Sequence, residues 1–246
     1  MNVLEVCAGD IDSVKAAAEG GAQRVELCSA LSEGGVTPSI GFIRKALDVS
    51  GIKVHVLIRP RNGDFLYSDD EIRLMIEDIV AVKHAGAHGV VIGALTPSGN
   101  IDIEACKRMV AAAEGLNVTF HRAFDLCKEP LKALDEIIEI GCNRLLTSGQ
   151  AATALEGVDL LRQLTIRAGK DLTILAGGGV TPENAAEILN LSGTNEIHAS
   201  ARETVKSKME YRKGGVSMGA TGSDEYTRKV TSSKIVSEIV RAINFK

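Results

Sequence analysis

The sequence predicts an α/β protein with the (β/α)8 TIM-barrel fold, in a single domain covering residues 1–246. Short β-branched segments alternate with longer helical patterns, and small-residue turns such as EGGAQ recur just before the strands. The chain of 246 residues also has the usual size of an eight-stranded parallel barrel, about 250 residues. A doubly wound sheet is the alternative fold, but it usually contains fewer strands.

Eight β-branched segments predict the strands of this barrel in chain order. They cover residues 2–8, 24–29, 53–60, 89–95, 117–124, 144–149, 172–178 and 196–201. The segments between them have the length and periodicity of helices, so each strand is expected to be followed by a helix that returns the chain to the start of the next strand.

Start signals mark several of these helices. Thr37 and Thr181 each precede a proline, so each is expected to cap a helix that begins at that proline. Residues 68–71, Ser-Asp-Asp-Glu, place acidic side chains in a first helical turn. Residues 202–230 show little periodicity, so a long irregular excursion is expected there before a last helix. Such a segment is a lid, an oligomer contact or a disordered loop.

Composition argues against several classes of function. The net charge is −4 without a basic cluster, and aromatic residues make up 3% of the chain, so a nucleic-acid partner is not expected. No apolar segment approaches the roughly 20 residues that span a bilayer, so no membrane partner is expected. The chain starts without a basic and apolar leader, and its five cysteines are irregularly spaced. A cytoplasmic location is therefore predicted.

Alternation along the strands places carboxylates and thiols inside the predicted barrel. Glu5 and Cys7 share a face of the first strand, and a carboxylate against the apolar helix layer would be costly, so both should face the lumen. The same parity places Glu26 and Cys28 inward from the second strand. Such groups near the carboxyl ends of barrel strands lie where barrel enzymes have their sites.

Further ionisable residues are predicted at the same end of the barrel. A single inward histidine is as readily a hydrogen-bonded core residue as a functional one, so the signal is the whole set. A barrel with a purely structural interior would fill these positions with Val, Ile and Leu. The candidate acid–base residues are Glu26, His55, His121 and Asp125.

Two features predict a site for a small anion. A pair of arginines after the third strand forms a fork suited to carboxylate or phosphate, although a salt-bridge network at the rim is the alternative. A run of glycines after the seventh strand leads into a helix, and its backbone N–H groups could hold an anion or simply permit a tight turn. The candidate anion-binding residues are Arg59, Arg61, Gly177, Gly178, Gly179 and Ser200.

The sequence argues against Schiff-base and nucleotide chemistry and leaves two cysteines as a candidate metal site. No lysine lies in the core of strands two to eight, which disfavours Schiff-base chemistry, and no dinucleotide or Walker motif stands in its proper setting, so no nucleotide cofactor is expected. Cys7 and Cys28 stand at matching positions of neighbouring strands. Two close thiolates suit a soft ion, Cu(I) above all. The alternative is that each cysteine is a small apolar filler.

Taken together, the motifs resemble the copper homeostasis protein family CutC. The matching blocks run nearly end to end and are LEVCAG, GAQRVELCSALSEGGVTPS, IRPRNGDFLYSDDE, TFHRAFD, RLLTSGQ, GGGVTPEN, EIHASAR and SMGA. The resemblance implies a cytosolic barrel, usually a homo-oligomer, here a dimer or tetramer. Vertebrate members have been described as binding Cu(I) through two cysteines, which correspond to Cys7 and Cys28.

Three functions therefore compete. In the first, Cys7 and Cys28 hold a copper ion for buffering or transfer. In the second, the barrel is an enzyme that acts on a small anionic, phosphorylated molecule. The third, an assembly scaffold with a vestigial mouth, fits poorly with so many ionisable groups in the lumen. Copper binding is the expected function, with the enzyme as the alternative.

Overall fold

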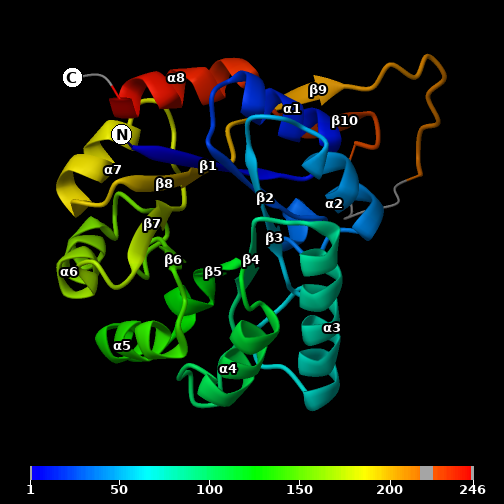
Figure 1. The fold of residues 1–246 in the computed structure, drawn as a ribbon. Helices are drawn as coiled ribbons and strands as arrows, with labels where there is room; N and C mark the ends of the chain where they lie inside the picture. The colour runs from blue at the N-terminus through cyan, green and yellow to red at the C-terminus, as the bar shows by residue number, and fades with distance from the viewer. Residues whose placement is uncertain (1, 217–223, 245–246) are drawn as a thin grey trace.

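The computed structural model describes residues 2–216 and 224–244, and it confirms the predicted barrel. Its eight parallel strands follow one another in chain order and close through pairing of β1 with β8. Helices surround the strands (Figure 1). The barrel strands are β1 (Val3–Ala8), β2 (Arg24–Leu27), β3 (Lys53–Leu57), β4 (Gly89–Ile92), β5 (Asn117–Phe120), β6 (Arg144–Thr147), β7 (Thr173–Gly177) and β8 (Glu196–Ala199).

A helix follows each barrel strand, as the (β/α)8 pattern requires. After β8 the connection is longer, because a two-stranded ribbon precedes the last helix. The helices are α1 (Ile11–Glu19), α2 (Ile40–Leu47), α3 (Asp69–Ala85), α4 (Ile103–Ala112), α5 (Pro130–Ile140), α6 (Val158–Ala168), α7 (Ala185–Ser192) and α8 (Ser233–Asn244), with short 3-10 turns at η1 (Leu31–Glu33) and η2 (Arg122–Leu126).

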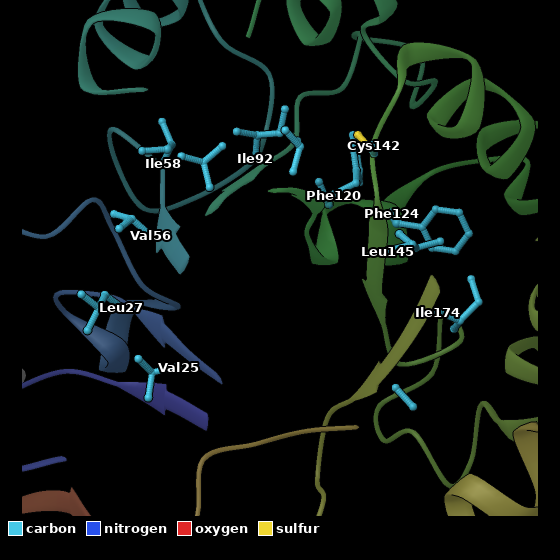
Figure 2. Close-up of a cluster of buried hydrophobic side chains, with 14 of the residues drawn as sticks. Val25, Leu27, Val56, Ile58, Ile92, Phe120, Phe124, Cys142, Leu145 and Ile174 are labelled. Carbon is cyan, nitrogen blue, oxygen red and sulfur yellow. The ribbon is translucent and has the colours of Figure 1, made fainter. Parts of the chain in front are cut away.

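The apolar core lies between the strands and the surrounding helices. Alternate strand residues such as Val25 and Leu27 are fully buried on this outer face, while Arg24 and Glu26 point inward. Figure 2 shows side chains of the outer face around the barrel, among them Val56, Ile92, Phe120, Leu145 and Ile174. Because the apolar residues occupy the outer face, the polar residues of the same strands are left to fill the lumen.

Of the three helix starts predicted from the sequence, the structure confirms one and differs at two. Ser68 caps α3 in a capping box with Glu71, as the acidic start signal suggests. The caps predicted at Thr37 and Thr181 are wrong. Helix α2 starts at Ile40, because the Thr37 hydroxyl accepts a hydrogen bond from the Arg59 backbone N–H instead. Helix α7 begins at Ala185, after a turn in which the Asn184 side chain accepts from the Thr181 N–H.

The excursion predicted as irregular is partly ordered. Its two ends form an antiparallel ribbon of β9 (Arg202–Lys206) and β10 (Thr227–Thr231), which extends beside α1 (Figure 1). Alternating threonine, valine and charged residues in both strands explain the pairing. Residues 217–223, which include the SMGA block, lie outside the described residues. Across the described ranges, no helix is long and apolar enough to cross a membrane.

Candidate functional site at the mouth of the barrel

A cavity of about 260 Å³ opens at the carboxyl end of the barrel strands. Its walls combine inward side chains from the strands with residues of the loops that follow them. Leu31 and Phe65 add apolar surface from the loops after β2 and β3, so the cavity is sheltered as well as polar. The polar lining includes Cys7, Glu26, Cys28, Arg59, His121 and His198.

Two thiols and a carboxyl group form one wall of this cavity. The strand register pairs Cys7 of β1 with Glu26 of β2, and Cys28 lies one pleat further toward the mouth. The Cys28 Sγ lies 3.5 Å from the Glu26 Oε2. Burial raises the pKa of Cys28 well above its usual value, and the Glu26 carboxylate and the Cys7 sulfur add to the rise. The two sulfurs are therefore close enough to influence each other.

The Glu26 carboxyl group lies in a setting that favours its neutral form. Burial is the main cause of a raised pKa for Glu26, and the negative charge of Glu5 adds to it. His198 acts in the opposite direction, because its ring places Nε2 at 3.8 Å from the Glu26 Oε2. A carboxyl group with a raised pKa holds its proton more readily than an exposed one, so Glu26 is a candidate proton donor.

His198 links the thiols to a buried carboxylate. Its Nδ1 lies 2.8 Å from the Glu5 Oε1. Burial alone would lower the pKa of His198, but hydrogen bonds with Cys7 and Glu5 and the nearby Glu26 carboxylate outweigh burial and raise it well above its usual value. The mouth therefore holds an imidazolium between two acidic groups and beside the thiols. His198 is not among the site residues predicted from the sequence.

Beneath the mouth, a buried ionic network fixes Glu5 in place. The Arg24 guanidinium binds Glu5 through Nε and Glu196 through Nη2, the latter at 2.5 Å. Arg144 binds the same Glu196 carboxylate, with 2.6 Å between Nε and Oε2. Burial would raise the pKa of Glu5, but Arg24 and His198 hold it well below its usual value. The carboxylate that orients His198 is therefore ionised and rigidly held.

His121 and Arg59 form the opposite wall. The His121 Nδ1 accepts a hydrogen bond from the Ala123 N–H at 3.2 Å, so the proton is on Nε2, which is buried without a partner in the described residues. Burial, aided by the Arg59 charge, lowers the pKa of His121 to about 3. Its ring lies 4.9 Å from that of Phe65. His121 is therefore a neutral imidazole with a free N–H group at the cavity.

Arg59 also ties together the loops that roof the cavity. Its Nη1 donates to the Gly35 carbonyl at 3.0 Å and its Nη2 to the Gly63 carbonyl at 2.6 Å. The Nε has no partner in the described part of the chain. Arg59 lines the cavity, but its two terminal nitrogens already donate hydrogen bonds to carbonyl groups of the two loops.

Other predicted site residues lie away from the cavity. Arg61 lies on the rim, where it binds Glu71 at 2.6 Å and Asp64 at 3.1 Å. For Arg61, the structure therefore agrees with the alternative of a salt-bridge network at the rim. Asp125 accepts hydrogen bonds from the loop after β6, including the Ser148 hydroxyl at 3.0 Å. His55 is buried beneath the mouth, near the amino ends of the strands. None of these three is among the residues that line the mouth cavity.

The glycine run after β7 makes a turn against its neighbour loop. Gly178 and Gly179 have φ values of +114° and +69°, which favour glycine, and they pack against Ser148 and Thr153. The Gly178 carbonyl accepts from the Ala154 N–H at 2.9 Å. Gly177 gives space to Leu146 and His198. These glycines and Ser200 are not part of the lining of the mouth cavity.

Two arginines outside the predicted anion-binding set also line the cavity. Arg122, in η2, binds Asp125 and the Ser148 hydroxyl, and it is 45% exposed. Arg202 begins β9 and reaches the mouth from the excursion after β8. Arg202 follows Ala201, which has a φ of +44°. Strained backbone of this kind is concentrated at functional sites, whereas the sequence itself offered only the block EIHASAR as a signal.

Fold and site define a class of protein: a TIM barrel whose mouth combines two buried thiols with carboxyl groups, imidazoles and arginines. The chain belongs to the CutC family, whose model matches residues 2–203. A CutC family protein of Bacteroides thetaiotaomicron is 51% identical over 98% of this chain and 97% of its own length. One from Chromobacterium violaceum is 50% identical over 98% of each chain.

Solved structures agree with this assignment. The copper homeostasis protein CutC of Streptococcus agalactiae superposes with a TM-score of 0.78 and 35% identity, over 81% of this chain and 99% of its own. Thiamine phosphate pyrophosphorylase of Pyrococcus furiosus, at 17% identity and a TM-score of 0.60 over 98% of this chain and 95% of its own, shows a likeness of fold alone.

Proposed function

We propose that the protein acts in copper homeostasis by binding Cu(I) through Cys7 and Cys28. The observation that carries the proposal is that Cys7 of β1 and Cys28, directly after the neighbouring strand β2, line one cavity. The copper homeostasis name of the Streptococcus agalactiae relative supports the same function. We extend to this chain the cytoplasmic location and homo-oligomeric state that the family resemblance implies.

The donor set suits copper better than other metals. Thiolates are soft ligands that select Cu(I), whereas a closed zinc site takes four ligands. Within residues 2–216 and 224–244, no group of three or more His, Cys, Asp or Glu side chains is arranged to hold a metal ion. A two-thiol site at the mouth is therefore the metal site with most support. The ion would lie beside Glu26 and His198, and the protons that the thiols lose on binding would be released to solvent.

Competition with a colourimetric Cu(I) chelator under anaerobic conditions tests this proposal. The wild-type chain should retain about one Cu(I), and the Cys7→Ser, Cys28→Ser double variant should bind at least ~100-fold more weakly. Cys142→Ser is the matched control, because Cys142 is a buried thiol outside the mouth. Equal copper affinity in the double variant, with circular dichroism showing an intact fold, would rule out this site.

A second candidate function is catalysis on a small phosphorylated molecule. Arg59, Arg122 and Arg202 line the same cavity as His121, whose buried Nε2–H has no partner in the described residues. Guanidinium groups bind phosphate, and a neutral imidazole can donate to a reacting oxygen. Glu26, with its raised pKa, could then supply or accept a proton.

Thermal shift with a panel of phosphorylated metabolites tests this second function. A hit should raise the melting temperature of the wild-type chain, and Arg202→Gln should reduce that shift. Arg162→Gln is the control, because Arg162 is exposed on α6 and does not line the cavity. A panel without any hit, or hits that Arg202→Gln leaves unchanged, would remove the support for an anionic substrate at the mouth.

A further inference from the structure

A second cavity of about 370 Å³ lies at the opposite end of the barrel. Apart from His55, which lies one pleat inside β3, its lining residues begin or shortly precede strands β2 to β6, so the cavity opens at the amino ends of the strands, away from the thiols. Neither copper binding nor the anionic-substrate alternative uses this end of the fold. The polar lining consists of Arg24, Lys53, His55, His88, Asn117 and Arg144.

The lining is strongly basic. Arg24, Lys53 and Arg144 carry three positive charges, and no acidic side chain is among the described residues that line the cavity. The carboxylates that bind the two arginines, Glu5 and Glu196, are not part of the lining. Lys53 is exposed, and it takes part in none of the ion pairs within residues 2–216 and 224–244. The ionic network therefore holds the arginines in place without covering the cavity with negative charge.

Several donors at this cavity remain unused. Arg24 makes its recorded bonds through Nε and Nη2, so Nη1 has no recorded partner among the described residues. The His88 Nδ1 accepts from the Val54 N–H at 3.1 Å, so a neutral ring has its proton on Nε2. Arg144 reaches Asn117 and Thr119 only at 3.4 Å. These groups could all donate to one acceptor-rich ligand.

His55 provides an independent observation that a ligand belongs here. It is 2% exposed, it lines the cavity one pleat deeper than Lys53, and its Nδ1 has no hydrogen-bond partner in the described residues. Buried polar atoms are nearly always hydrogen-bonded, so an orphaned ring nitrogen requires an explanation. Burial lowers the pKa of His55 to about 3, so the ring is neutral and can donate one N–H bond.

We propose that this basic cavity is a binding site for a small oxyanion that carries a phosphate group, either free phosphate or a phosphomonoester. Phosphate offers several acceptor oxygens, which match the unused N–H groups of the ion-paired arginines, the ammonium group of Lys53 and a neutral imidazole donor. The arginines are already oriented by Glu5 and Glu196, so binding would cost little side-chain ordering. Because Glu5 also binds His198, an anion here is connected to the mouth through Arg24 and Glu5.

Histidine-selective NMR during titration with inorganic phosphate, at constant ionic strength, tests the site. The ring signals of His55 and His88 should shift along a saturable curve, while exposed His84 on α3 serves as an internal control. Lys53→Gln should raise the apparent dissociation constant about five- to tenfold. Lys170→Gln should leave it unchanged, because Lys170 is an exposed lysine before β7 that does not line the cavity.

The outcomes separate this site from the mouth. Saturable shifts at His55 that weaken in Lys53→Gln support the proposal, and a parallel titration with glycerol phosphate then shows whether the free ion or the ester binds more tightly. Shifts confined to His121 and His198 would place the anion at the mouth and overturn it. An unchanged affinity in Lys53→Gln, or no saturable shift, would show that these charges are structural only. Copper binding could fail or succeed without affecting any of these results.

Discussion

Histidines that face the barrel lumen lie against glycines of the neighbouring strand. His55 of β3 pairs with Gly89 of β4, and His198 of β8 pairs with Gly177 of β7. A Cβ atom added at Gly89 would lie 2.7 Å from the His55 Nε2. These glycines do not have positive φ values, so they are required for space and not for backbone conformation. Each imidazole ring thus occupies space that the side chain of any residue larger than glycine would fill at the paired position.

The variant Gly93→Ala tests this packing at the mouth. Its Cβ would lie 2.5 Å from the His121 Cε1 and 3.3 Å from the Ala123 Cβ, so the imidazole must move. Overpacking of this kind is expected to lower the free energy of unfolding by about 1–3 kcal/mol, measured by urea denaturation. Gly41→Ala is the control, since no atom lies within 4 Å of that Cβ, and a helical Gly→Ala change should be stabilising. Equal stability of wild-type protein and Gly93→Ala would contradict this account.

Strand parity explains why much of the lumen could be predicted from the sequence. Glu5, Cys7, Glu26 and Cys28 all point inward, because period-two alternation is a local property of any strand. Parity does not specify depth along the barrel. His55 was therefore expected with the mouth residues, but it lies at the opposite end of the barrel. Depth depends on the stagger between strands, which only the closed barrel determines.

Among the structural elements, η2 and the loop after β6 are joined by one carboxylate. The Asp125 side chain accepts from the N–H and hydroxyl groups of Ser148 at 3.0–3.2 Å and from the Gln150 N–H at 3.2 Å. Arg122 binds the same carboxylate at 2.7 Å. Asp125 therefore connects two loops of the mouth, a role that the sequence motif TFHRAFD could not distinguish from catalysis.

Asp125→Asn should weaken this connection. Loss of the charge-assisted bonds is expected to lower the free energy of unfolding by about 1.5–3 kcal/mol, and hydrogen exchange of the Ser148 and Gln150 amides should become faster. Asp64→Asn is the control, because Asp64 is 70% exposed and its ion pair with Arg61 should contribute at most about 1 kcal/mol. If both variants lost the same small stability, Asp125 would not be a structural anchor.

Helix starts show which elements a local signal can predict. The cap of α3 follows from Ser68 and Glu71 alone, because both partners of the capping box lie within one turn. The start of α2 depends on a contact between Thr37 and Arg59, which are 22 residues apart. Such a tertiary contact competes with the local cap, and nothing near Thr37 in the sequence reveals it. The strands were predictable for the opposite reason, since their signal is entirely local.

At the scale of the whole molecule, the lumen is layered by charge. The thiols, Glu26 and His198 line the mouth, Glu5 lies below them, and the arginines with Glu196 lie toward the amino ends. Opposite charges are paired within and between these layers: His198 and Arg24 bind Glu5, and Arg24 and Arg144 bind Glu196. The stability of the barrel should therefore respond to the protonation of the few lumen groups whose pKa values change on folding.

Two buried histidines set the acid side of this response. Burial lowers the pKa of both His55 and His121 to about 3, whereas an unfolded histidine has a value near 6.5. The unfolded chain binds more protons in this window, so stability is fully present above about pH 6.5 and falls as pH drops toward 3. Each of these two histidines should lower the free energy of unfolding by about 2 kcal/mol at pH 5.

His198 has the opposite effect, because its raised pKa stabilises the fold below about pH 6.5 and this contribution is lost at higher pH. Stability should therefore be highest near pH 6.5.

Urea denaturation at several pH values measures this profile. Between pH 7.5 and pH 5, the two buried histidines should together lower the free energy of unfolding by about 4 kcal/mol, partly offset by His198. In His55→Gln this acid-side loss should shrink by about 2 kcal/mol, because one proton-excluding site is gone. His84→Gln, a change at an exposed histidine of α3, should leave the profile unchanged. A loss of equal size in wild-type protein and His55→Gln would mean that His55 accepts a proton in the folded barrel, and the basic cavity around it would then have to accommodate another positive charge.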